Sequence, residues 1–154
     1  MSDATLSLSD ASQTFEVRRS LFVAALDSAR WTDAKVHAFT GPGAGVPEDG
    51  RFYLTSDLAS GYAVRADGYL TCVFSLVKGR GRRLVSDALL DGATHGDCFG
   101  EYLRDLYVAG GFVAVGNADW DDEQAPDAAA VATLFAVCGP RPAVHFFETA
   151  DFRS

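Results

Sequence analysis

The sequence predicts an α+β domain in which a mixed, mostly antiparallel central sheet is flanked by helices on both faces. Three observations predict this class. The pair Asp67-Gly68, a strong signal for a tight hairpin, separates two strand-like runs. The second run, Tyr69 to Val77, is apolar on both faces, as is typical of a strand that is covered on both sides. The hydrophobic period then becomes helical, first at 84–89 and again at 102–107.

The N-terminal third predicts a helix, a short strand and a loop. Apolar residues recur at helical spacing from Gln13 to Arg30, with Ser12 or Asp10 as the N-cap. We expect a short strand over 35–40. The glycine- and proline-rich run at 41–50 predicts a loop, which is either a plain surface connection or a flap over a substrate site.

The middle of the chain predicts three strands, the last two paired as a hairpin, and then a helix and a fourth strand. The three strands are expected over 51–56, 61–65 and 69–77. The apolar stripe at 84–89 predicts a helix that ends at Gly92, and His95–Phe99 predicts another short strand.

The C-terminal part continues the alternation of helices and strands. The stripe at 102–107 predicts a helix, and Gly110-Gly111 supplies a left-handed stop for it. The following elements are expected to be a strand at 112–115, an acidic loop at 117–127, a helix at 128–137 and a strand at 144–148. Early antiparallel strands followed by alternating elements fit a three-layer α+β sandwich, and 154 residues fit one domain over 1–154.

Composition narrows the functional classes. The formal net charge of −8 disfavours sequence-independent binding to nucleic acid, because phosphate backbones would be repelled. The sequence contains no apolar run of the ~20 residues that a bilayer-spanning helix needs. The polar N-terminus lacks the build of a secretory signal, so a cytoplasmic location is expected.

The cysteines and histidines predict no metal site and no disulfide framework. Cys72, Cys98 and Cys138 are widely spaced, and no His-x-x-x-His pair is present. Cys98 is interpreted as a buried apolar residue, with an acyl-carrying nucleophile as the alternative. His95 would not serve as its base, because the two residues would face opposite sides of one strand.

A basic, glycine-containing turn between the apolar strand and the next helix is the first candidate for chemistry. Glycines allow close backbone approach, and the first turn of a helix offers unpaired N–H groups and the positive end of the helix dipole. This combination suits a pyrophosphate, although a solvated surface turn has the same composition. It matches neither a P-loop nor a dinucleotide-binding fingerprint. The residues are Lys78, Gly79, Arg80, Gly81, Arg82 and Arg83.

The segment from Gly68 to Phe112 resembles the acyl-CoA-binding core of the GNAT superfamily of N-acyltransferases. In that family a central strand leads into a Gln/Arg-x-x-Gly-x-Gly/Ala turn, which Lys78, Gly81 and Arg83 match in part. Arg83 stands where a small residue is usual, and it either narrows the approach to the phosphates or points outward and binds them. The resemblance implies that the turn holds the pyrophosphate of acetyl-CoA.

A second part of the resemblance lies at the end of the later helix. Tyr107-Val-Ala-Gly-Gly-Phe112 is similar to the family's Tyr-x-x-x-Gly-Phe ending, and the run from Gly92 to Leu103 resembles a subset of GNAT-like proteins. The resemblance implies that Tyr107 is the general acid that protonates the departing CoA thiolate. A neutral phenol with an ordinary pKa of about 10 can act in this way. The alternative is a half-buried helix residue.

The family mechanism also implies main-chain contacts and a base. Two neighbouring strands splay apart in these enzymes, and backbone groups of one strand bind the pantetheine arm; the matching positions are Phe74, Ser75 and Leu76. The general base is commonly an acidic side chain acting through water. The candidates for it are Asp97, Glu101 and Asp57.

Two functions compete. The first is an N-acetyltransferase that moves an acetyl group from acetyl-CoA to an amine acceptor by direct attack in a ternary complex. The second is a GNAT-like binding or regulatory domain with a degenerate site. The acidic stretch at 119–127 could attract a cationic amine, although a solvated loop is the simpler interpretation. A homodimer is compatible with either function, and modification of a nucleic acid is disfavoured by the charge.

Overall fold

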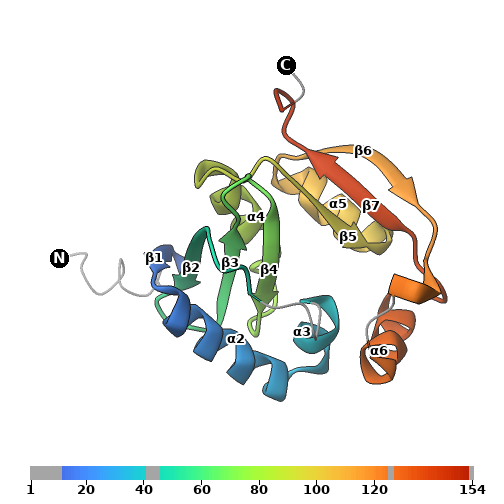
Figure 1. Cartoon of the computed structure of the whole chain (residues 1–154), viewed down its shortest axis with the longest axis horizontal. Coiled ribbons are helices and arrows are strands. Elements are labelled where there is room, and N and C mark those ends of the chain that lie inside the picture. Colours follow the sequence, from blue (N-terminus) through green and yellow to red (C-terminus); the bar gives the residue numbers. More distant parts are fainter. Residues whose placement is uncertain (1–11, 41–45, 125–126, 153–154) are drawn as a thin grey trace.

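The computed structural model describes residues 12–40, 46–124 and 127–152, which form an α+β fold with two antiparallel sheets (Figure 1). The first sheet contains, in spatial order, β1 (Thr14–Val17), β2 (Arg51–Thr55), β3 (Ser60–Val64) and β4 (Leu70–Ser75). The second contains β5 (His95–Phe99), β7 (Val144–Glu148) and β6 (Val113–Ala118), again in spatial order. The predicted α+β class is confirmed, but two sheets replace the single predicted one.

Helices cover both faces of the first sheet. The helices of the described residues are α2 (Arg19–Thr32), α3 (Ala34–Phe39), α4 (Gly81–Leu90), α5 (Gly100–Gly110) and α6 (Ala128–Cys138), with a 3-10 turn η2 (Asp122–Gln124). Helix α2 buries Phe22 and Leu26 against one face of the first sheet. Helix α4 buries Leu84 and Val85 against Tyr62 on the other face. Helix α5 covers one face of the second sheet.

The two sheets are joined by parallel pairing at a single point. Tyr69, just before β4, and His95, at the start of β5, form an isolated parallel bridge. The N–H of Thr94 donates to the carbonyl of Gly68 at 2.8 Å and reinforces this point. Beyond it β4 and β5 separate along their length, as Figure 1 shows. The two strands are therefore neighbours at their beginnings and apart at their ends.

An irregularity in β4 changes which of its side chains point to each of the two cores. The pairing register of β3 and β4 shifts between Gly61 and Ala63, and Cys72 has a positive φ of 54°. An extra residue in one strand exchanges the faces on either side of it. Leu70 accordingly packs in the cluster under α4, whereas Phe74 packs in the cluster under α2. The predicted burial of this strand on both faces is confirmed.

A third, smaller core joins α3 to α6 next to the separated ends of the sheets. Ala38 of α3, Leu134 of α6 and Trp120 form this cluster. His37 Nε2 lies 3.1 Å from Asp127 Oδ2, and Asp127 also caps α6 by accepting from the N–H of Ala130. This contact links the N-terminal and C-terminal parts of the chain.

Of the predicted N-terminal elements, the helix is confirmed with a later start, and the short strand is wrong. The predicted helix from Gln13 begins instead at Arg19, because residues 14–17 form β1 and pair with β2. The N-cap is Arg18 rather than Ser12, and Asp10 lies outside the described residues. The predicted strand at 35–40 is the helix α3, whose first turn is capped by the Asp33 side chain accepting from Lys35 N–H.

The remaining predicted elements are found, most with shifted ends, whereas the strands predicted at 95–99 and 144–148 have the predicted bounds. The predicted hairpin is the antiparallel pair β3–β4, and the strands expected at 51–56, 95–99 and 144–148 are β2, β5 and β7. Helix α5 ends at Gly110, with Gly111 at φ 126°, as its glycine pair predicts. The expected acidic loop is shorter than predicted, because β6 extends to Ala118 and η2 begins at Asp122.

No helix among the residues that the structure describes is both long enough and apolar enough to cross a membrane. Residues 41–45 of the predicted loop lie outside the described ranges. Of the rest of that loop, Val46 is buried, and its carbonyl accepts from Arg19 at 2.7 Å.

Candidate functional site

The glycine turn follows the end of β4, away from the bridge between Tyr69 and His95 that joins the two sheets. Strand β4 ends at Ser75 and α4 begins at Gly81, so residues 76–80 form the connection. Gly79 has a φ of 90°, which an L side chain rarely adopts. Within the described residues, no acceptor in the chain is found for the backbone N–H groups of 81–83, the first turn of α4. Unpaired N–H groups at a helix start, together with the helix dipole, favour an anion at this position.

The basic side chains around this turn have different environments. Lys78 and Arg82 are exposed, and neither forms an ion pair with another described residue. The guanidinium of Arg83 lies 3.4 Å from Asp87, one helical turn further on, so this side chain extends along α4 rather than over the turn. The positive charge available to a ligand therefore comes mainly from two of the four residues.

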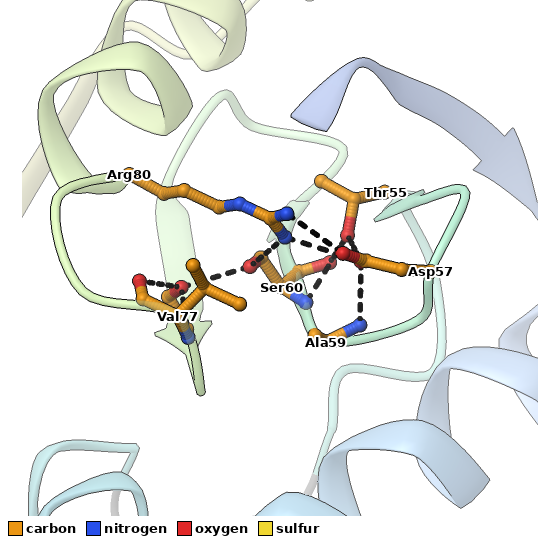
Figure 2. Close-up of polar contacts among 7 residues, drawn as sticks. Thr55, Asp57, Ala59, Ser60, Val77 and Arg80 are labelled. Atoms are coloured by element: carbon orange, nitrogen blue, oxygen red, sulfur yellow. Dashed lines mark hydrogen bonds and ion pairs between the residues drawn. The ribbon is translucent and has the colours of Figure 1, made fainter. Parts of the chain in front are cut away.

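Arg80 points back towards the turn between β2 and β3. Its Nη1 and Nη2 donate to the two carboxylate oxygens of Asp57 at 3.1 and 2.7 Å, as Figure 2 shows. Nη1 also donates to Ser60 Oγ at 3.0 Å. The Arg80 guanidinium holds the pKa of Asp57 well below its ordinary value. Arg80 is thus occupied by partners within the chain.

The strand residues of the predicted site divide by the direction of their peptide groups. Leu76 N–H donates to the carbonyl of Ala59 at 2.8 Å, so this peptide is used in pairing with β3. Peptide groups point alternately to the two sides of a strand. The main-chain groups of Phe74 therefore also point towards β3, whereas those of Ser75 point away from β3, towards the side of β4 on which β5 lies. Of the three predicted residues, Ser75 is the best placed to offer main-chain groups to a ligand. Phe74 contributes a buried ring to the α2 core.

Tyr107 lies against the second sheet, close to the junction. Only 8% of it is exposed, its ring stacks on Phe147 at 4.3 Å between centroids, and the ring of Phe112 lies at 6.2 Å. Burial raises the pKa of Tyr107 well above 10, and the neighbouring Cys98 and Asp97 add to the rise. The phenol is therefore a neutral proton donor over the physiological pH range.

The three acidic candidates for a base are not equivalent. Asp57 is an ion-paired carboxylate with a depressed pKa, which makes it a poor proton acceptor. Glu101 is exposed in the first turn of α5. Asp97 is exposed on β5, and its charge helps to raise the pKa of Tyr69 at the sheet junction. Asp97 is thus the candidate that shares a neighbourhood with Tyr107.

The cysteines offer no activated nucleophile. Cys98 is 7% exposed, and burial raises the pKa of its thiol to about 12. All three cysteines are free thiols. Among the residues that the structure describes, no group of three or more His, Cys, Asp or Glu side chains could hold a metal ion.

A hollow of about 240 Å³ lies away from these residues. It is lined by Asp119, Trp120, Arg141 and Ala143. Arg141 forms an ion pair with Asp122 at 2.9 Å, so part of the acidic stretch is neutralised within the chain. No pattern in the sequence predicts this arrangement or the Asp57–Arg80 pair, whose members stand 23 positions apart.

Comparisons of the chain with protein-family models, with curated proteins and with solved structures found no match. The functional argument therefore depends on the geometry of the sheet junction, the glycine turn and Tyr107.

Proposed function

We propose that the chain is an N-acetyltransferase that transfers an acetyl group from acetyl-CoA to an amine by direct attack in a ternary complex. The observation that carries this proposal is the junction of β4 and β5. The two strands start side by side at Tyr69 and His95 and then diverge, with the glycine turn at the far end of β4. Such a divergence is the feature through which GNAT enzymes admit the pantetheine arm.

Further features support the same proposal. Strand β7 lies between β5 and β6, and β4 carries an irregularity at Cys72, so the arrangement is compatible with a GNAT-like fold. The turn would bind the pyrophosphate through its N–H groups, with Lys78 and Arg82 adding charge-assisted contacts. Ser75 would offer main-chain groups to the arm.

The residues then have distinct chemical roles. The amine nitrogen bonds to the thioester carbonyl carbon as the carbon–sulfur bond breaks. Tyr107 donates its hydroxyl proton to the departing sulfur, and a base accepts the proton that the amine loses. Asp97, acting through water, is the candidate for that base.

Calorimetric titration with CoA and acetyl-CoA tests the proposal. We expect both to bind, and we expect the affinity to fall with rising salt because the phosphates are held partly by Lys78 and Arg82. The double variant Lys78→Ala/Arg82→Ala should bind more weakly, whereas Lys35→Ala, which removes a charge from α3, should not. Absence of binding to the wild-type chain at millimolar ligand would exclude the proposal.

A second candidate function is a binding or regulatory domain of the same shape without catalysis. The deep burial of Tyr107 favours it, as does the position of the 240 Å³ hollow away from that residue. A chain that binds acetyl-CoA but transfers no acetyl group to a panel of primary amines would support this alternative. Transfer to any of these amines, detected by mass spectrometry, would exclude it.

A further inference from the structure

A continuous polar network connects the β2–β3 turn to both ends of the glycine turn (Figure 2). At one end, Arg80 is held by Asp57 and Ser60. At the other end, Ser60 Oγ lies 2.8 Å from Ser75 Oγ, which donates to the carbonyl of Val77 at 2.7 Å and accepts from its N–H at 3.1 Å. The segment 75–80 is thus fixed where it leaves β4 and where it enters α4.

Asp57 is itself held rigidly. One of its carboxylate oxygens accepts from Thr55 Oγ1 at 2.6 Å and from the N–H of Ala59 at 3.0 Å, in addition to the Arg80 guanidinium. The side chain of Arg80 is only 15% exposed. A two-pronged contact between a planar guanidinium and an immobilised carboxylate fixes direction as well as distance. The β2–β3 turn therefore acts as an anchor for the start of α4.

We propose that Arg80 is a positioning residue, which with Asp57 holds the glycine turn in the conformation that binds the phosphates of acetyl-CoA. This rests on the proposed function. It departs from the role that the sequence indicates for Arg80, namely a direct contact with the pyrophosphate. Lys78 and Arg82 remain the direct cationic contacts.

The substitution Asp57→Asn distinguishes direct phosphate binding by Arg80 from positioning of the turn by Arg80, because the two roles predict opposite results. If Arg80 bound the phosphates directly, loss of the competing carboxylate would release the guanidinium and remove a nearby negative charge, so CoA would bind more tightly. If Arg80 positions the turn, the same substitution loosens the turn and reduces the fraction of molecules that can bind. The apparent dissociation constant rises by the reciprocal of that fraction.

Binding and kinetics of Asp57→Asn provide the first test. We expect the CoA dissociation constant and the KM for acetyl-CoA to rise about fivefold or more, with kcat within about twofold of the wild type, as a smaller competent fraction requires. Arg80→Lys keeps the charge but loses the bidentate contact with Asp57, and it should show the same changes in the dissociation constant, KM and kcat. Asp67→Asn is the matched control, because it breaks the Arg65–Asp67 pair, 2.7 Å long, in another turn. Unchanged or tighter binding in Asp57→Asn would overturn the proposal.

Amide hydrogen exchange gives a measurement that does not require a ligand. In Asp57→Asn and Arg80→Lys we expect faster exchange at the hydrogen-bonded amides of Leu76, Val77 and Leu84, with β7 unchanged. If the wild type does not bind CoA, the proposed function is excluded. Hydrogen exchange still tests whether Asp57 and Arg80 anchor the glycine turn. Equal exchange in variants and wild type would overturn the positioning role even if CoA binds.

Discussion

Burial sets the protonation state of Tyr107 and so determines what this side chain can do. Its hydroxyl stays protonated because an ionised phenolate would be costly in this buried position, which also lies near the charge of Asp97. We expect Tyr107→Phe to lower kcat by about 100-fold, as loss of a general acid does, with little change in CoA affinity. The stack on Phe147 is kept in this variant. Steady-state kinetics with parallel calorimetry provide the measurement, and equal turnover would remove Tyr107 from the mechanism.

Burial also keeps the Cys98 thiol protonated and therefore unreactive as a nucleophile. With a thiol pKa of about 12, only about one molecule in 10⁴ carries the thiolate at pH 8. We therefore expect iodoacetamide to label Cys98 very slowly in the native chain and rapidly in urea, as peptide mass spectrometry can measure. Incubation with acetyl-CoA should leave Cys98 unmodified. An acetylated Cys98 peptide would instead favour a covalent intermediate.

The Asp57–Arg80 pair should make stability depend on pH. Because the pKa of Asp57 is lowered in the folded chain, its contribution is present above the unfolded value of about 4 and is lost as the pH falls below it. Asp57→Asn should lower the free energy of unfolding at pH 7 by about 1 kcal/mol, a modest figure because the side chain is 34% exposed. Urea unfolding at pH 7 and at pH 3 should show the difference shrinking at the lower pH. A difference independent of pH would contradict this origin.

At the scale of elements, the sequence pattern predicted correctly those features that depend on residues close together in the chain. The Asp67-Gly68 hairpin and the glycine stop of α5 were predictable because each depends on a few adjacent residues. Strand β1 was missed because its pairing with β2 depends on residues almost 40 positions away. The short helix α3 was missed because its buried Val36 and Ala38 mimic the alternation of a strand. For the site, the turn was predictable, but the anchoring of Arg80 by Asp57 was not.

The packing of α4 on α5 depends on a glycine. A Cβ added at Gly110 would lie 2.7 Å from Val85 Cβ, and Ser86 Oγ donates to the Gly110 carbonyl at 3.0 Å. Gly110→Ala must therefore push the helices apart, and we expect a loss of about 1–3 kcal/mol in the free energy of unfolding. Gly116→Ala in β6 is the control, because nothing lies within 4 Å of the added atom. Urea unfolding measures both, and equal stabilities would show that the two helices are not in close contact.

At the scale of the whole molecule, the last part of the chain completes the second sheet and packs against α3. Strand β7, the last strand, inserts between β5 and β6, and α6 packs on α3 from the other end of the sequence. Such long-range order cannot be predicted from local periodicity, because the same pattern of strands fits several orders within a sheet. The separation of β4 from β5 also depends on this long-range pairing, because β4 pairs with β3 whereas β5 pairs with β7.

The α3–α6 core should unfold together with the sheets if the molecule is one cooperative unit. Trp31 is 92% exposed and Trp120 is 7% exposed, so in a Trp31→Phe background the fluorescence reports the core around Trp120. Leu134 is fully buried in that core, and Leu134→Ala should cost about 3 kcal/mol. We expect the urea midpoints from fluorescence and from far-ultraviolet circular dichroism to fall together. A shift in fluorescence alone would show that α6 and Trp120 detach while the sheets stay folded, so the link through His37 and Asp127 would not hold the two parts together.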